Sequence, residues 1–426
     1  MALTYPEIVE ILKISQDVVP ARDIRFGAFE RAVSFYCQSD GLHLPDGGRG
    51  VFLIAGTNGK GTVAKTLETL LSLTGANVGL FTSPHLIEPL ERIRTGGRDL
   101  TPDEMVQAYE LIRSCVESFA LSHFEILTLL MIEIFFGGRV RPRVDLAVIE
   151  VGVGGRLDPT RVVPHETCVV TSIGLDHEAI LGSTVGAIAR EKFAIAAGAR
   201  RLIYAPQVAD VGPAVLAARA EFPTVEFHQA RTFPAVVSVV AGQPQWTMKS
   251  PWGSVALSLL GARAVENSSV ALEVLDRCGY DVAHLVRGLS AVDWPGRMEP
   301  LKFAGRRVYL SGDHNEAGVN SLIGLLSSFE YERVWIVVGI GRGKPLEAMV
   351  STYLSIPRVS VVLTLTSFRT IHLDDLAVWR PRVAAIVADP MEALVLACAS
   401  ASEKDLVVVS GSLYLVGELR AKILMS

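Results

Sequence analysis

One segment, Ile54-Ala55-Gly56-Thr57-Asn58-Gly59-Lys60-Gly61-Thr62, lies between an apolar run at residues 50–53 and residues 63–71, where apolar residues recur every three or four positions. This pattern predicts a buried strand, a glycine-rich turn and a helix. Backbone N–H groups and the helix dipole can bind a phosphate at such a turn. Lys60 can reach the β- and γ-phosphates of a nucleotide, and Thr62 can offer a hydroxyl to Mg²⁺. Only two residues separate the first two glycines, so the match to G-x-x-x-x-G-K-[ST] is imperfect, and a glycine-rich helix start without a ligand is the alternative.

Length and composition limit the possible classes of protein. The chain has 426 residues, of which half are hydrophobic and 20% are charged, and this favours two or three domains with large cores. The net charge of −5 gives no basic footprint, so we expect no nucleic-acid partner. The five cysteines include no CxxC pair, which argues against zinc and against a disulfide framework. The chain starts without a signal pattern, and its most apolar stretch, residues 124–136, is too short to span a bilayer, so we expect a cytoplasmic protein without a membrane segment.

Polar residues follow several of the predicted strands. Ser83, Glu150 and His177 each come after an apolar run, and Arg156 lies in the glycine-rich stretch that follows Glu150. Open α/β sheets bind ligands at the carboxyl ends of their strands. Ser83 and Glu150 offer oxygen ligands for Mg²⁺, and His177 can ligate a second Mg²⁺ or support it. Arg156 can meet a phosphate or a substrate carboxylate as a bidentate fork. The alternative for Ser83 is a simple Ser–Pro turn.

The glycine-rich segment also carries a resemblance to a known family. Gly-Thr-Asn-Gly-Lys-Gly-Thr resembles the nucleotide loop of the Mur ligase superfamily, in the form typical of folylpolyglutamate synthases and dihydrofolate synthases. The resemblance continues through further segments in the family's order: residues 82–86 with 91–93, residues 122–128, residues 150–158, Leu175-Asp176-His177, Arg190-Glu191-Lys192, residues 294–299 and residues 411–418.

This resemblance implies an activity. A carboxylate takes the γ-phosphoryl group of ATP and becomes an acyl phosphate, which the amine of L-glutamate attacks to form an amide. The implied substrates are folate or dihydropteroate and L-glutamate, and the implied cofactors are ATP and Mg²⁺ at two sites. We expect a monomer.

The residues and the resemblance together assign the site. The expected catalytic residues are Lys60, Lys192 and His314, and the resemblance implies that Lys192 is carbamylated. The expected nucleotide contacts are Thr57, Asn58, Gly59, Lys60, Gly61, Thr62, Asn267, Arg297, Ser311 and Asp313. The expected metal ligands are Thr62, Ser83, Glu150, His177 and Lys192. The expected substrate contacts are Arg31, His85, Phe124, Glu125 and Arg156, with a solvated helical arginine and a helix-dipole role as the alternatives for Arg31 and Glu125.

Alternating strand and helix patterns predict the fold class α/β. We expect an ATP-binding Mur-ligase-type central domain at residues 1–296, with a P-loop-type, mostly parallel sheet and a small antiparallel appendage at residues 223–260. A Pro–Gly step then leads to a Rossmann-like ligase domain at residues 297–426.

Three departures from the family pattern leave two other functions open. Arg263 and Ala264 stand where the family has His-Gln, Ser311 replaces an Asp while Asp313 follows two residues later, and residues 341–344 differ from a family loop rich in Asp and Lys. The alternatives are a Mur-type ligase that acts on a different carboxylate acceptor, and a nucleotide-binding relative without ligase activity.

Overall fold

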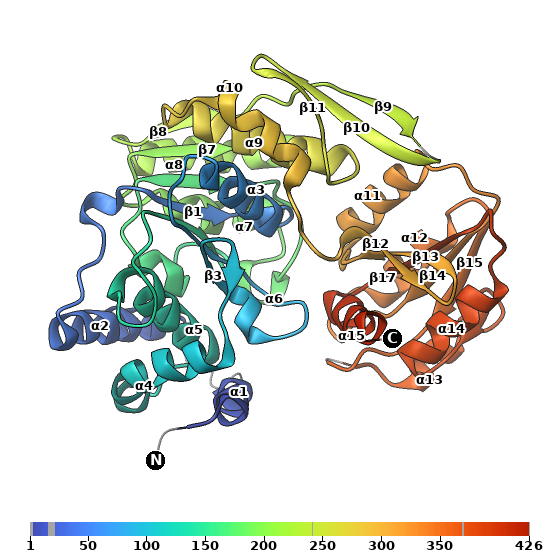
Figure 1. Ribbon diagram of the computed structural model, residues 1–426, viewed down its shortest axis with the longest axis horizontal. Helices are drawn as coiled ribbons and strands as arrows, with labels where there is room; N and C mark the ends of the chain where they lie inside the picture. The colour runs from blue at the N-terminus through green and yellow to red at the C-terminus, as the bar shows by residue number, and fades with distance from the viewer. Residues whose placement is uncertain (1–2, 16–21, 241, 369, 426) are drawn as a thin grey trace. The chain divides into compact units, whose positions relative to one another are not determined.

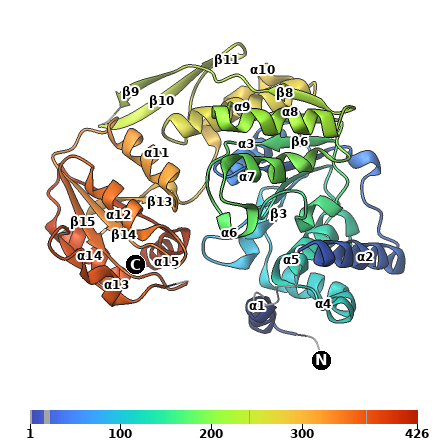
Figure 2. The same ribbon diagram turned by 180° about the vertical axis from the view of Figure 1, so that it is seen from behind.

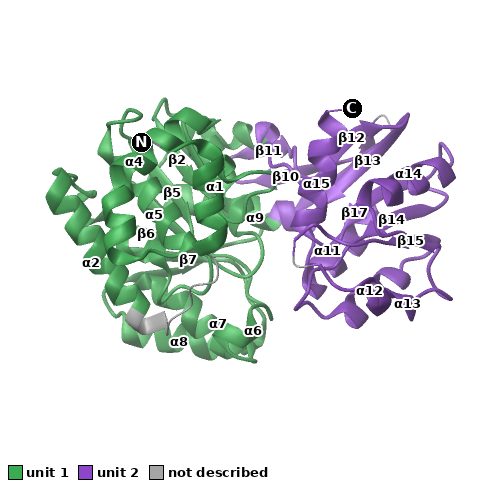
Figure 3. Ribbon diagram, turned by 90° about the horizontal axis from the view of Figure 1, so that it is seen from below, with its two compact units in different colours: residues 1–233, 266–289 green, residues 234–265, 290–426 purple. Residues whose placement is uncertain are grey.

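The computed structural model describes residues 3–15, 22–240, 242–368 and 370–425. The chain divides into two compact units, residues 1–233 with 266–289 and residues 234–265 with 290–426 (Figure 3). The first unit does not coincide with the predicted range 1–296, because residues 234–265 group with the C-terminal residues. The functional division at residue 296 therefore stays a prediction.

A mostly parallel sheet forms the centre of the first unit (Figure 1). Within the described residues it has eight strands in the order β4-β3-β2-β5-β1-β6-β7-β8. The pairs β2–β3 and β3–β4 are antiparallel, and the other pairs are parallel. The central strand β1 is buried along its whole length, as its continuous apolar run predicts. The strands are β1 (Val51–Ala55), β2 (Val78–Phe81), β3 (Ile93–Thr95), β4 (Arg98–Asp99), β5 (Leu146–Glu150), β6 (Thr167–Val170), β7 (Arg201–Tyr204) and β8 (Glu226–Gln229).

Helices pack on both faces of this sheet, and α7 and α8 pack against each other (Figure 2). The apolar segment that follows α5 continues as a π-helix at Glu133–Gly137 rather than ending at a turn. None of the helices in the described part of the chain combines the length and apolar character that crossing a membrane requires. The helices are α1 (Tyr5–Ile14), α2 (Arg22–Asp40), α3 (Lys60–Ser72), α4 (Pro102–Phe119), α5 (His123–Ile132), α6 (Glu178–Leu181), α7 (Val185–Phe193), α8 (Gly212–Glu221), α9 (Ala262–Arg277) and α10 (Val282–Leu285).

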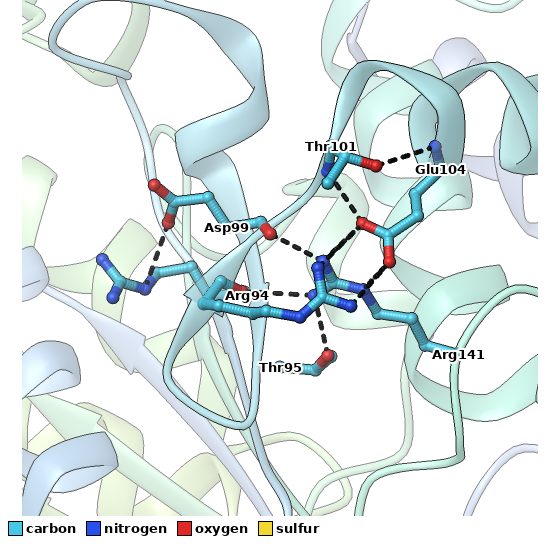
Figure 4. A network of polar contacts seen from close by, with 7 residues as sticks. Arg94, Thr95, Asp99, Thr101, Glu104 and Arg141 are labelled. Atoms are coloured by element: carbon cyan, nitrogen blue, oxygen red, sulfur yellow. Dashed lines mark hydrogen bonds and ion pairs between the residues drawn. The ribbon is translucent and has the colours of Figure 1, made fainter.

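A buried arginine fastens the β3–β4 hairpin to the start of α4 (Figure 4). Arg141 pairs with Glu104 at 2.5 Å and donates to the Thr95 hydroxyl at 2.9 Å and to the Asp99 carbonyl at 2.6 Å. Glu104 also accepts from the backbone N–H of Thr101, the N-cap of α4. Because the strand that follows the Ser83 loop is held in this way, the loop has a fixed end.

The predicted antiparallel appendage is present as a three-stranded sheet in the order β11-β10-β9. One part of the predicted range does not belong to it. Residues 226–229 form β8, which pairs parallel with β7 in the first sheet. A four-residue strand carries too little periodicity to show which sheet it joins. The three strands are β9 (Ala235–Val240), β10 (Gln243–Ser250) and β11 (Gly253–Ala256).

The second unit carries the other α/β sheet, and the α/β fold class is confirmed. Its strand order is β12-β13-β17-β14-β15-β16, with β12 antiparallel to β13 and the other pairs parallel. The strands are β12 (Arg297–Phe303), β13 (Arg306–Ser311), β14 (Val334–Val338), β15 (Val359–Leu363), β16 (Ala385–Ile386) and β17 (Leu406–Ser410). The helices are α11 (Glu316–Leu326), α12 (Leu346–Leu354), α13 (Leu373–Ala377), α14 (Pro390–Ser400) and α15 (Leu413–Leu424).

Candidate functional site

The glycine-rich turn joins β1 to α3 as the sequence predicts. Gly56 has a φ of +146°, and a Cβ there would lie 1.8 Å from the Thr171 hydroxyl oxygen. Gly59 has a φ of +91° and is the N-cap of α3, and a Cβ there would lie 2.3 Å from the Asn267 side-chain oxygen. Both positions therefore need glycine for conformation and for space. The second contact also places Asn267, a predicted nucleotide contact, against the turn.

The turn is fixed by backbone contacts with the segment after β6. The Thr57 N–H donates to the Ser172 carbonyl at 2.9 Å, and the Thr57 hydroxyl donates to the Gly174 carbonyl at 3.1 Å. Thr57 thereby ties this turn, residues 56–62, to the segment that leads to His177. We call the turn the phosphate loop, after its predicted role. His177 itself is exposed and has a φ of +52° at the start of α6.

Two lysines flank this turn. Lys192 is 4% exposed, and its Nζ donates to the Gly56 carbonyl at 2.8 Å. Burial, followed by repulsion from Lys60, lowers the pKa of Lys192 to about 7. A large share of its amine is therefore neutral near pH 7. Lys60 begins α3, and its Nζ donates to the Thr57 carbonyl at 3.4 Å.

Glu150 and Ser83 meet beside the turn. Ile54 of β1 pairs in register with Glu150, so the carboxylate comes at the end of the neighbouring strand β5. The buried Glu150 carboxylate accepts the Ser83 N–H at 2.9 Å. Strands β1, β2, β5 and β6 are parallel neighbours, and their carboxyl ends therefore bring Ser83, Glu150 and the phosphate loop to one edge.

A preformed metal cage is absent from the described residues, where no three His, Cys, Asp or Glu side chains gather around one point. This does not exclude Mg²⁺, because that ion is usually held by one or two carboxylates together with substrate phosphates and water. Glu150 is such a carboxylate. Thr62 offers a hydroxyl from the first turn of α3, two residues after Lys60. The donor chemistry at this edge therefore fits Mg²⁺ as part of a nucleotide complex.

The loop after β2 holds a buried cation beside two neutral imidazoles. Arg92 is 7% exposed, and its Nε donates to the His85 Nδ1 at 2.8 Å. Burial and the charge of Arg92 lower the pKa of His85 to about 3 and that of His123 to about 4. The Glu91 carboxylate accepts from the N–H groups of residues 86, 87 and 88, which holds the loop in place.

The predicted substrate residues on the helices differ in environment. Phe124 packs against Phe81, with ring centroids 5.8 Å apart, and a Cβ at Gly152 would lie 2.6 Å from its ring. The buried Glu125 carboxylate is held by the Arg25 guanidinium, with Nε 2.9 Å from each oxygen. Glu125 therefore already has a protein partner. Arg31 is exposed on α2. Its predicted contact remains a prediction.

Arg156 faces two carboxylates of the protein. Its Nη1 lies 3.1 Å from Glu221 and its Nε 3.6 Å from Glu191. The hydrogen bond with Glu221 is the main reason that the pKa of Arg156 is raised.

In the second unit, the predicted residues gather after β13. The Ser311 hydroxyl donates to the Asp313 carboxylate at 2.6 Å, and His314 Nδ1 lies 3.0 Å from the Gly312 carbonyl. Burial raises the pKa of Asp313, while the Ser311 hydrogen bond and the charges of Arg297 and Arg263 oppose that rise. The substituted positions Ser311 and Arg263 therefore act on the same carboxyl group.

The sequence patterns assign no role to two residues that organise the site, Asp158 and Arg25. Asp158 is 2% exposed and accepts from the N–H groups of Val153 and Thr160, each at 3.0 Å, which shapes the loop after Glu150. Asp158 stands in the Gly-Gly-Arg-Leu-Asp motif, so its position was a usable signal. Arg25 had no such signal, because its partner Glu125 lies 100 residues away in the sequence.

Comparison with known proteins identifies the family. The family model described as "Mur ligase, glutamate ligase domain" matches residues 296–413. The chain is 32% identical over 388 residues to a probable bifunctional folylpolyglutamate synthase/dihydropteroate synthase of Halobacterium salinarum, covering 87% of this chain and 46% of the relative. The chain thus spans about half the length of that relative.

Two further likenesses cover more of the related protein. The chain is 31% identical over 307 residues to the dihydrofolate synthase/folylpolyglutamate synthase of Escherichia coli, covering 70% of this chain and 68% of the relative. The structure of Mycobacterium tuberculosis folylpolyglutamate synthase complexed with ADP superposes with a TM-score of 0.84 at 25% identity, and the match covers 98% of both chains. The chain therefore belongs to the folylpolyglutamate synthase and dihydrofolate synthase family of the Mur ligase superfamily.

Proposed function

We propose that this protein is an ATP-dependent ligase that joins L-glutamate to a carboxylate of folate or dihydropteroate through an acyl phosphate. The observation that carries the proposal is the meeting of the phosphate loop, the Glu150 carboxylate and the buried Lys192 amine at one edge of the sheet. The names of the relatives and the ADP bound to the Mycobacterium tuberculosis enzyme support the same reaction and the use of ATP.

Each group at this edge suits phosphoryl transfer. Lys60 and the N–H groups of the phosphate loop would neutralise charge on the β- and γ-phosphates. Thr62, Ser83 and Glu150 would hold Mg²⁺, with His177 as the candidate for a second ion. When bound, Mg²⁺ would offset the charge that develops on the transferred phosphoryl group.

Carbamylation of Lys192 belongs to the same proposal. Carbon dioxide reacts with a neutral amine and forms a carbamate, which releases one proton. The pKa of about 7 favours that neutral form. A carbamate would also add an oxygen ligand of the kind that Mg²⁺ prefers.

Asn267, Arg297, Ser311 and Asp313 remain proposed nucleotide contacts, and His314 a proposed catalytic residue. His85 and Phe124 remain proposed acceptor contacts. His85 lies in the loop that contains Ser83, and Phe124 lies on α5 beside Gly152. Both are next to the sheet edge with Glu150, where a substrate carboxylate must approach the γ-phosphate. Dihydropteroate is the first acceptor to test. The name of the Halobacterium relative combines a folylpolyglutamate synthase with a dihydropteroate synthase, whose product is dihydropteroate.

The test is phosphate release with ATP, Mg²⁺ and L-glutamate, comparing dihydropteroate, tetrahydrofolate and no acceptor. We expect release that requires both glutamate and one pterin. The Glu150→Gln variant should lower that rate by on the order of 100-fold, because losing a metal-binding charge costs at least as much as losing an outer partner. Glu226→Gln, an exposed glutamate on β8, is the matched control and should leave the rate unchanged.

Two results would contradict the proposal. Release with a non-pterin carboxylate alone would identify a ligase for a different acceptor. ATP binding without any glutamate-dependent release would identify a nucleotide-binding protein without ligase activity, in line with the substitutions at Arg263 and Ser311.

A further inference from the structure

The loop that follows Glu150 lies directly on the last turn of α7. A Cβ at Gly155 would lie 2.5 Å from the Glu191 carbonyl oxygen and 3.0 Å from the Lys192 carbonyl oxygen. The backbone N–H of Arg156 donates to the Glu191 carbonyl at 3.0 Å. The loop and the helix end are therefore in backbone contact, with no room for a side chain between them.

The guanidinium of Arg156 adds contacts on either side of this backbone bond. It lies 3.6 Å from the Glu191 carboxylate on α7 and 3.1 Å from the Glu221 carboxylate, the last residue of α8. One arginine thus links the loop to two helices, which pack against each other (Figure 2). A planar guanidinium suits such a bridge because its donors point in fixed directions.

The residue after Glu191 is Lys192, whose amine contacts the phosphate loop at the Gly56 carbonyl. At the other end of the Arg156 loop is Glu150, whose carboxylate binds the Ser83 N–H. The loop that carries Arg156 therefore connects Glu150 with the end of α7, where Lys192 lies, and its guanidinium contacts the carboxylates of Glu191 and Glu221.

We infer that Arg156 is a positioning residue that fixes Lys192 relative to Glu150 by holding the loop against α7 and α8. The inference rests on the proposed ligase function and differs from the predicted contact between Arg156 and a substrate. Exposed ion pairs contribute little to folding free energy, so the effect on overall stability is small. A displacement of about 1 Å at a reacting group, in contrast, can cost on the order of 100-fold in rate.

The chain offers a closely matched control arginine. The Arg200 N–H donates to the Glu166 carbonyl at 2.9 Å, and its guanidinium lies 3.6 Å from the Glu166 carboxylate and 3.7 Å from that of Glu226. Arg200 thus makes a backbone hydrogen bond and two carboxylate contacts, as Arg156 does, although its two ion pairs are longer than the 3.1 Å pair of Arg156 with Glu221. Arg200 precedes β7 and so lies at the amino ends of the parallel strands, away from the phosphate loop. Arg200→Met removes the same kind of bridge without touching the proposed site.

The first measurement is steady-state kinetics of Arg156→Met, Arg156→Lys, Glu221→Gln and Arg200→Met. We expect Arg156→Met to lower kcat by about 10- to 100-fold while the KM values for ATP, acceptor and glutamate stay within about threefold. Arg156→Lys should recover part of the loss, and Glu221→Gln should lower kcat by about threefold, as the loss of one exposed pair predicts. Arg200→Met should match the wild type.

The second measurement does not need activity. Acetylation of Lys192 by acetic anhydride, which transfers one acetyl group to the amine and releases acetate, is followed by peptide mass spectrometry at pH 8 in buffer free of bicarbonate. Because the loop covers the helix end that carries Lys192, Arg156→Met should speed the labelling at least about fivefold relative to wild type and to Arg200→Met, whereas labelling of the exposed Lys13 should not change.

The outcomes separate the two proposals. Wild-type protein without glutamate-dependent phosphate release would refute the ligase function, and faster Lys192 labelling in Arg156→Met would still support the positioning role. Arg156 would instead be a substrate ligand if Arg156→Met raised the KM for acceptor or glutamate tenfold or more without changing kcat, and if Glu221→Gln had wild-type kinetics. Unchanged labelling together with unchanged kcat would also overturn the inference.

Discussion

The buried amine of Lys192 is expected to lower the free energy of unfolding at neutral and acidic pH. Its side chain is 4% exposed, and burial lowers its pKa from 10.5 to about 7. The difference between these pKa values corresponds to about 5 kcal/mol at about 1.4 kcal/mol per pKa unit. Below pH 7 both the folded and the unfolded chain hold the proton, so the folded protein bears the whole cost of a buried charge.

Replacing Lys192 by methionine removes that charge and keeps an unbranched side chain of similar length. The substitution also leaves the buried Gly56 carbonyl without its donor, which costs about 1–3 kcal/mol at any pH. The balance predicts that Lys192→Met is more stable than the wild type by about 3 kcal/mol at pH 6.

The gain must shrink as the pH rises. Between the folded and unfolded pKa values of Lys192 the unfolded chain binds the proton and the folded chain does not, so the stability of the wild type increases with pH. By pH 9 this increase amounts to about 2.7 kcal/mol, and the two proteins should then be nearly equal in stability. The same substitution should abolish the proposed activity, so Lys192 illustrates stability given up for function.

The assay must report on the first unit. All five tryptophans, at positions 246, 252, 294, 335 and 379, belong to the second unit, so their fluorescence does not follow the region around Lys192. Hydrogen exchange of peptides from β1 and β5 in increasing urea measures the relevant opening free energy. It should be measured at pH 6, 7.5 and 9 without carbon dioxide, with Lys13→Met as the exposed control.

Either of two results would refute this reasoning. One is a Lys192→Met protein that is equal to or less stable than the wild type at pH 6. The other is a stability difference that stays constant from pH 6 to pH 9, because a buried titrating amine requires that difference to change with pH.

Three other substitutions test the fold around the site. Gly56→Ala places a Cβ 1.8 Å from the Thr171 hydroxyl, so ATP affinity measured by calorimetry should fall at least about tenfold with a stability loss of about 2–4 kcal/mol, and an affinity within twofold of wild type would contradict the loop geometry. Glu133→Gln breaks the ion pair between the fully buried Glu133 carboxylate and Arg139, so urea unfolding should show that the free energy of unfolding falls by about 3 kcal/mol. A fall below about 0.5 kcal/mol would contradict this. The Arg141 guanidinium lowers the pKa of Glu104, so Glu104→Gln should be less stable than wild type at pH 7, and the difference should shrink as pH falls below about 4.3; a difference equal at pH 7 and pH 3 would exclude this pairing.

The sequence by itself determined the elements at the phosphate loop. A continuous apolar run, three glycines and a helical spacing are local signals, and they correctly predict β1, the turn and α3. The α/β class and the family follow from the same kind of local evidence, since motifs keep their order and spacing along the chain. Both of these predictions are confirmed.

Only the tertiary structure decided which groups meet. Lys192 contacts Gly56 across 136 positions of sequence, and Arg156 pairs with Glu221 across 65. Residue type gives the charge and reach of a side chain, whereas its partner depends on how the sheet order and the helix packing bring distant segments together. The residue type of Arg156 suggests a contact with a phosphate or a substrate carboxylate, which stays a prediction. Only the folded chain shows that its guanidinium also faces two carboxylates of the protein itself.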